Sequence, residues 1–137
     1  MDHRRRFSAF VASERDPRPT IVEALEFVRE VLSTTTCDEH TRSKVAIVVE
    51  ELLSNTLRHG GENRDISLAL TLEDKGSVIE LEVEDDASPF DPSLATDFTG
   101  PDPHTGGGIG LAIIRAWGED ISYNRRENRN ILRLTLR

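Results

Sequence analysis

Glu51-Leu52-Leu53-Ser54-Asn55-Thr56-Leu57-Arg58-His59-Gly60 is the stretch that decides the fold. It closes a predicted helix that begins near Asp38, where apolar residues at steps of three and four form one buried face. Glu51 and Asn55 are four residues apart, so they lie on one side of this helix. Glu50 points elsewhere, because it lies about 140° from Asn55 around the axis. A carboxylate and an amide so placed can orient a nucleophile and a hard metal ion, whereas the alternative is an ordinary polar helix edge.

The end of the same helix adds positive charge to this side. Arg58 lies about 20° beyond Glu51, and His59 about 40° beyond Asn55. A carboxylate, an amide and a cation therefore line the rim of the apolar stripe. Gly60 and the glycine after it are a helix stop signal, so the helix is predicted to run to His59.

Composition restricts the class of protein. The chain has 137 residues, which suits one domain over 1–137, and a net charge of −8, which argues against nucleic acid as a direct partner. Cys37 is the single cysteine, so no intramolecular disulfide or metal–thiolate cluster can form, and this suits a reducing cytoplasm. The apolar run near the start is too short for a signal peptide, and no segment approaches transmembrane length, so no membrane association is expected.

The first quarter of the chain predicts a strand and a helix. Residues 6–12 alternate loosely and read as a short strand. Thr20 followed by Glu23 is a capping-box signature for the start of a helix with one apolar face. Asp38 can cap the central helix that follows.

Two alternating stretches after the central helix predict a hairpin, at 66–73 and 79–84, joined by a turn at 74–76. Continuing the period of two, Asp85 falls on the same side as Leu81 and Val83, so the strand delivers a carboxylate to the edge of the buried face. A buried carboxylate needs a hydrogen-bond donor. That donor is either a ligand amine or amide, or else a loop backbone N–H or an arginine.

A long segment without periodicity, 86–105, then leads into a glycine run at 106–108, Ile109 and Gly110. Loops of this length in a compact domain are functional or disordered. A glycine loop entering a helix, here predicted at 111–117, is suited to binding anions through backbone N–H groups. A flexible hinge is the alternative interpretation.

The end of the chain predicts a last hairpin. Ile121 and Tyr123 alternate, as do the leucines of 132–136, and 126–130 makes the turn. The arginines here form either a patch for an acidic protein partner or a solvated strand face, and the second is favoured. They are Arg125, Arg126, Arg129, Arg133 and Arg137.

Three motifs thus stand in a fixed order: Glu-x-x-x-Asn on a helix, Asp at a strand end with Pro-Phe-Asp-Pro after it, and Gly-x-Gly-x-Gly before a helix. This order resembles the N, G1 and G2 boxes of the GHKL ATPase superfamily, which has the Bergerat ATP-binding fold. Within it, the chain resembles the anti-sigma factor serine/threonine kinases. The closest stretches are 51–60, 83–92, 106–115 and 121–136.

The resemblance implies an α+β fold. This is a two-layer α/β sandwich, with a mixed, mostly antiparallel sheet of about five strands covered on one face by about three helices. It also implies roles for the residues on the first two motifs. Glu51 would be the general base, Asn55 would hold Mg²⁺ through its side-chain oxygen, and Asp85 would accept from the adenine amino group of ATP. A single protein ligand is reasonable, because Mg²⁺ keeps waters and takes phosphate oxygens.

The resemblance places the phosphates on the glycine loop. Gly106, Gly108 and Gly110 would wrap them, Arg58 could help to neutralise them, and 91–105 would be a lid over the nucleotide. The motif has glycine two residues after its aspartate, where this chain has Ala87, and it has a second glycine where the chain has Pro89. The implied nucleotide-binding set is completed by His59, Ala87, Pro89, Phe90, Thr105, Gly107, Ile109 and Leu111.

The family branch implies an activity and partners. The chain would phosphorylate Ser or Thr on a small anti-sigma factor antagonist, sequester a sigma factor or other regulatory protein, and form a homodimer in the cytoplasm. One alternative is a non-catalytic ATP-binding module that sequesters a partner without phosphotransfer. Another, the catalytic half of a histidine kinase, fits less well, since no additional long dimerisation helix carries a histidine.

Overall fold

Strands form where apolar and polar residues alternate, and helices where apolar residues recur every three or four positions. The computed structural model describes residues 4–57, 64–89 and 109–137. In chain order the elements are β1 (Arg4–Val11), α1 (Arg18–Ser33), α2 (Glu39–Asn55), β2 (Ile66–Asp74), β3 (Ile79–Asp85), α3 (Ile109–Trp117), β4 (Glu119–Arg126) and β5 (Arg129–Leu136).

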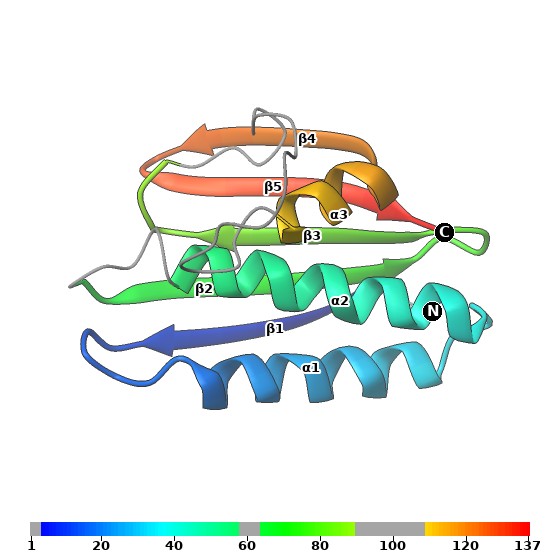
Figure 1. The fold of residues 1–137 in the computed structure, drawn as a ribbon, viewed down its shortest axis with the longest axis horizontal. Helices are drawn as coiled ribbons and strands as arrows, with labels where there is room; N and C mark the ends of the chain where they lie inside the picture. The colour runs from blue at the N-terminus through cyan, green and yellow to red at the C-terminus, as the bar shows by residue number, and fades with distance from the viewer. Residues whose placement is uncertain (1–3, 58–63, 90–108) are drawn as a thin grey trace.

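The five strands form one sheet in the order β1-β2-β3-β5-β4, and the three helices cover one of its faces (Figure 1). All four pairings between the described strands are antiparallel. The predicted two-layer α+β sandwich is confirmed, and its sheet has no parallel pair among the described strands. None of the described helices is long and apolar enough to span a membrane.

The core lies between the helices and the sheet. The helices contribute the apolar faces that their periodicity predicts, and each sheet strand contributes alternate residues. Fully buried members include Val28, Leu32, Val45, Leu53, Leu70, Leu72, Ile79, Leu81, Ile114, Leu134 and Leu136. This layer holds α2 across the middle of the sheet, so that its C-terminal end lies beside the end of β3 (Figure 1).

The start of α1 differs from the prediction. The helix begins at Arg18 after Pro17 and carries a proline in its first turn, without a side-chain cap. Proline fits there because the first N–H groups of a helix have no partner within it. The Arg18 N–H donates to Asp16 Oδ1 at 3.0 Å. The predicted capping box at Thr20 is therefore wrong, since Thr20 already lies inside the helix.

The start of α2 confirms the prediction for Asp38. Its side chain accepts a hydrogen bond from the Thr41 N–H at 2.8 Å, and this bond lowers the pKa of Asp38. The α-helix ends at Asn55, and Thr56 and Leu57 continue as a wider π-type turn. The predicted end at His59 and the glycines after it lies outside the described residues.

Other boundaries shift by two residues. β1 runs over Arg4–Val11 where 6–12 was predicted, β4 begins at Glu119 before the predicted Ile121, and α3 begins at Ile109 where Leu111 was expected. These ends carry charged residues or glycine, which leave no apolar period to follow. In β1 and β4 the pairing with the neighbouring strand nevertheless extends across them.

The face of the sheet without helices is covered by ion pairs. Arginines of β1 reach across β2 to glutamates of β3, and arginines of β5 meet the same glutamates from the other side. Ala69 and Thr71 of β2 are buried on this face, consistent with cover by long arginine side chains. The pairs are Arg4–Glu82 (3.8 Å), Arg6–Glu84 (3.6 Å), Arg129–Glu84 (2.8 Å) and Arg133–Glu82 (2.7 Å).

These pairs bear on the two interpretations of the basic C-terminal hairpin. Arg129 and Arg133 pair with glutamates of the neighbouring strand, and Arg137 pairs with Glu119 at 2.7 Å. Arg125 donates to Asn130 and to a backbone carbonyl. Most of the predicted basic patch therefore serves contacts within the chain, as the solvated-face interpretation favoured.

A two-residue turn joins β4 to β5. Glu127 and Asn128 both have positive φ, 53° and 64°. Two consecutive residues of this kind are typical of a type I′ turn, whose twist matches that of the flanking strands. The strands continue to Arg126 and restart at Arg129, so the hairpin is tighter than the turn predicted over 126–130.

Replacing this turn by Asn-Gly (Glu127→Asn with Asn128→Gly) is expected to raise the melting temperature. Both new residues tolerate the left-handed backbone better than glutamate, for which the conformation costs about 1–2 kcal/mol. Thermal unfolding followed by circular dichroism measures the gain. Asn128→Val, which places a β-branched residue at positive φ, is the opposite control and should lower it. An Asn-Gly variant that melts no higher than wild type contradicts this account of the turn.

Candidate functional site

The site begins with Asp85, the last residue of β3. The period of two places it on the helix-covered face with Leu81 and Val83, and its exposed fraction is 6%. The predicted phase of this strand is thus confirmed. A carboxylate at this depth must be supplied with donors by its surroundings.

Three residues from different parts of the chain supply those donors. Asp85 Oδ1 accepts from Asn130 Nδ2 at 2.9 Å and from the Ala87 N–H at 3.0 Å. Asp85 Oδ2 accepts from Thr56 Oγ1 at 3.4 Å, a long contact. One predicted alternative, a loop backbone N–H, is present. The side-chain donors from α2 and β5 were not predicted.

Burial raises the pKa of Asp85 above its ordinary value of 3.8, while the hydrogen bonds from Asn130, Ala87 and Thr56 act in the opposite direction. Two of these three donors serve the same oxygen, Oδ1. The other oxygen, Oδ2, has only the long contact from Thr56 among the described residues.

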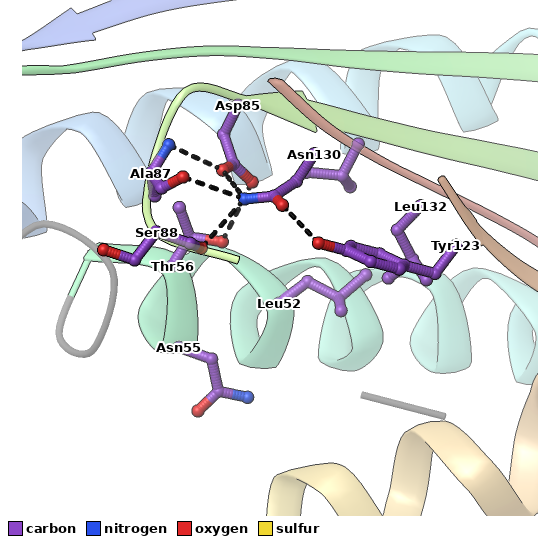
Figure 2. Close-up of a pocket in the computed structure, with 10 residues that line it drawn as sticks. Leu52, Asn55, Thr56, Asp85, Ala87, Ser88, Tyr123, Asn130 and Leu132 are labelled. Carbon is purple, nitrogen blue, oxygen red and sulfur yellow. Dashed lines mark hydrogen bonds between the residues drawn. The ribbon is translucent and has the colours of Figure 1, made fainter. Parts of the chain in front are cut away.

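The Asp85 pocket lies between the C-terminal end of α2, the end of β3 and the β4–β5 hairpin (Figure 2). Its walls are mostly apolar, with Asp85 and Asn130 as the buried polar groups. Its cavity volume is about 30 Å³. A cavity of this volume can hold water. The lining residues are Leu52, Asn55, Thr56, Val83, Asp85, Ala87, Ser88, Tyr123, Asn130 and Leu132.

Asn55 lies at the other end of this pocket. In Figure 2 its side chain extends away from the Asp85–Asn130 group. Its Nδ2 is buried and has no hydrogen-bond partner in the described part of the chain. A buried amide without a partner costs free energy, which a ligand can recover. Rotation of the amide by 180° exchanges oxygen and nitrogen, so either atom can face that ligand.

The helix phase of Glu50 is as predicted. Glu50 is exposed and lines a groove between α1 and α2, on the side away from the Asp85 pocket. Glu51 is half-buried, one turn before Asn55, and is not among the residues that line the Asp85 pocket. Any role of Glu51 is therefore expected near Asn55 and not beside Asp85.

Ala87 occupies its position without backbone strain. It is buried, and it is not one of the residues with positive φ. Its N–H donates to Asp85, and its carbonyl accepts from Asn130 and Arg125. A glycine is therefore not required here for conformational freedom. Pro89 is exposed at the end of the described loop.

The remaining predicted site residues lie outside this geometry. Arg58, His59, Phe90 and 105–108 are outside the described residues, as is the predicted lid at 91–105. Ile109, Gly110 and Leu111 form the first turn of α3. The anion site expected of the glycine run stays a prediction.

Asn130 is the main residue that sequence reasoning missed. The signal was present, because the period of two that places Leu132, Leu134 and Leu136 on the buried face places Asn130 there too. An asparagine beside a predicted turn instead suggests a turn residue. Tyr123, which donates its hydroxyl to Asn130 Oδ1, was predicted to alternate in the strand but not to contact the site.

Comparison with known proteins identifies the family of this domain. A family model described as a histidine kinase-like ATPase domain matches residues 14–136. The chain belongs to this family. The match includes every element except β1, so the ATPase domain takes in both the Asp85 pocket and the Asn55 end of α2.

Solved structures were compared as well, and the match with a TM-score of 0.52 has the same fold. The chain resembles two nucleotide-free forms of the catalytic domain of the histidine kinase ThkA. One is 20% identical with a TM-score of 0.52, the other 18% identical with a TM-score of 0.49, and each comparison covers 95% of both chains. A search of curated proteins finds no match.

The raised pKa of Asp85 predicts a pH-dependent stability. Above pH 3.8, its ordinary value, the folded state still holds the proton that the unfolded chain releases, so this group makes stability fall as pH rises. Asp85→Asn lacks the ionisation. Its unfolding free energy relative to wild type should therefore increase as pH rises above 3.8 and level off above the folded-state pKa. Urea denaturation across acidic to neutral pH measures the difference.

Asp38→Asn is the control of opposite sign. The Thr41 N–H lowers the pKa of Asp38. Wild type therefore gains stability over this variant as pH rises from the folded-state pKa to 3.8, the ordinary value. A difference for Asp85→Asn that is flat with pH, or that follows the Asp38→Asn curve, contradicts the assignment of burial as the dominant cause.

Proposed function

We propose that this ATPase domain is a protein serine/threonine kinase of the anti-sigma factor type. It binds Mg-ATP, phosphorylates a small anti-sigma factor antagonist on serine or threonine, and sequesters a sigma factor. Unphosphorylated antagonist captures the kinase and frees the sigma factor. The kinase acts as a cytoplasmic homodimer.

The Asp85 pocket is the observation that carries the nucleotide assignment. It offers a buried carboxylate with one oxygen committed to the protein and the other held by one long contact from Thr56. Apolar side chains of Leu52, Val83 and Leu132 stand around it. A flat apolar base with an exocyclic amino group, adenine, fits both features.

The Asn55 end of the site suits the phosphates and their cation. Among the described residues, no group of three His, Cys, Asp or Glu could hold a metal ion alone. Mg²⁺ at Asn55 would therefore take most of its ligands from phosphate oxygens and water, which is its usual preference. When bound, Mg²⁺ supplies neutralisation of the phosphate charge. Asn55 would hold it through its amide oxygen.

Glu51 is the proposed general base. It lies one helical turn before Asn55, so a hydroxyl brought to the terminal phosphate comes within its reach. The hydroxyl oxygen forms the new bond to phosphorus, the bond to ADP breaks, and the proton passes to Glu51. The serine or threonine preference, the antagonist and the sigma factor rest on the sequence resemblance.

Mg-ATP is expected to raise the melting temperature of the wild-type chain. A ligand at about 100 times its Kd adds about 2.7 kcal/mol to the unfolding free energy. Asp85→Asn should lose most of this shift, because an amide cannot offer the same charged acceptor. Thermal unfolding with and without Mg-ATP measures both. Asn124→Ala, an exposed change on β4, should retain the full shift. An equal shift in Asp85→Asn removes Asp85 from the base site.

Three variants of α2 separate chemistry from binding. Glu51→Ala should bind Mg-ATP and partner normally but transfer phosphate about 10²–10⁴-fold more slowly, since it lacks the base. Asn55→Ala should weaken Mg-ATP binding itself. Glu50→Ala, exposed on the far side of the helix, should change neither.

Nucleotide titrations and transfer of labelled phosphate to candidate antagonists provide the measurements. An inactive Glu50→Ala beside an active Glu51→Ala would contradict the base assignment. A wild type that binds ATP and a sigma factor but labels no antagonist would replace the kinase with the alternative, a binding module without phosphotransfer.

A further inference from the structure

The Asn130 side chain is more completely bonded than any other group in the Asp85 pocket. Its exposed fraction is 5%. Nδ2 donates to Asp85 Oδ1 at 2.9 Å, to the Ser88 carbonyl at 3.0 Å and to the Ala87 carbonyl at 3.2 Å. Its Oδ1 accepts from the Tyr123 hydroxyl and from Arg125 Nη1, the latter at 2.9 Å. The amide therefore meets three acceptors with its nitrogen and two donors with its oxygen (Figure 2 shows the bonds within the pocket).

These partners allow one orientation of the amide. Exchanging its oxygen and nitrogen would set an oxygen against three acceptors and an NH₂ group against the guanidinium of Arg125, which can only donate, whereas the Tyr123 hydroxyl could turn to accept. Each mismatch in a buried place carries the cost of an unsatisfied polar group. Arg125 of β4 on one side and the three acceptors on the other therefore hold Asn130 with its N–H groups towards Asp85 and the loop after it.

The orientation of Asn130 in turn divides the two oxygens of Asp85. Oδ1 receives two donors, Asn130 Nδ2 and the Ala87 N–H, at 2.9 and 3.0 Å. Oδ2 receives only the 3.4 Å contact from Thr56 among the described residues. Asn130 also holds the carbonyls of Ala87 and Ser88, so the loop and the carboxylate are fixed by the same side chain.

We propose that Asn130 is a positioning residue that sets the hydrogen-bonding polarity of the nucleobase site. It commits Oδ1 of Asp85 to the protein, so that Oδ2 alone faces the base, as an acceptor. A 6-amino purine offers N–H donors to that oxygen, whereas a 6-oxo purine offers a lone pair and is rejected. This inference rests on the proposed function, since it takes ATP as the ligand of the pocket.

The D85N variant makes this arrangement testable. In wild type, Asn130 Nδ2 and the Ala87 N–H both donate to Asp85 Oδ1. In D85N the amide oxygen must therefore take the position of Oδ1, where it can accept from them. Its NH₂ group then takes the Oδ2 place, where the Thr56 hydroxyl can accept from it. The pocket thereby offers a donor, and the preferred base should change from 6-amino to 6-oxo. ITP differs from ATP at this end of the base and keeps the same sugar and phosphates.

The experiment measures Kd for ATP and for ITP, with Mg²⁺, on each variant. Wild type is expected to prefer ATP, and D85N to prefer ITP, each on the order of tenfold or more. In the D85N background, N130A removes the donor and the near-isosteric N130D replaces it with an acceptor. Both should weaken the preference of D85N for ITP over ATP, measured as the ratio of the two Kd values, because the new amide is then less firmly oriented. N124A, an exposed asparagine of the same hairpin, should leave every ratio unchanged.

The ratio of the two constants is insensitive to a general loosening of the fold, because both nucleotides share every other contact. N130D keeps the size of the side chain if N130A fails to fold. A D85N protein that still prefers ATP, or one whose ITP preference persists in full with N130A and N130D, overturns the role of Asn130 alone. A wild-type protein that binds neither nucleotide overturns the proposed function and this inference together.

Discussion

A carboxylate on the buried face of a sheet must be given donors, and the geometry of this molecule around β3 follows from that constraint. Asp85 reaches the buried face because β3 keeps its alternation to its last residue. Its donors come from the end of α2, the loop after β3 and the start of β5, which are distant in sequence. Satisfying one side chain thus ties three segments together at one end of the sheet. The same end is where the pocket opens.

The sequence predicted those features that depend on local periodicity. The strand phase placed Asp85 correctly, the helix phase separated Glu50 from Glu51 and Asn55, and Asp38 caps α2 as expected. Each of these rests on a repeat within a few residues. The family resemblance predicted the layers and the number of strands, which no short repeat contains.

The features that were missed depend on pairing across the sheet. Asn130 meets Asp85 because β3 and β5 are neighbours in register, with these two residues as direct partners. Nothing near Asn130 in the sequence indicates that partner, 45 residues away. The wrong capping box at Thr20 has a different cause. Thr20 and Glu23 fit the common capping pattern, but Pro19 suits the first turn of a helix that begins earlier, at Arg18.

The ion-paired face of the sheet has a consequence for how the domain meets other proteins. A sheet covered by helices on one side usually risks exposing an apolar or unpaired surface on the other. Here Glu82 and Glu84 each lie between two arginines, one from the first strand and one from the last. A protein docking flat on this face would have to strip water from charges that are already matched, with little new attraction in return. Stacking two such sheets face to face would therefore gain little from electrostatic attraction.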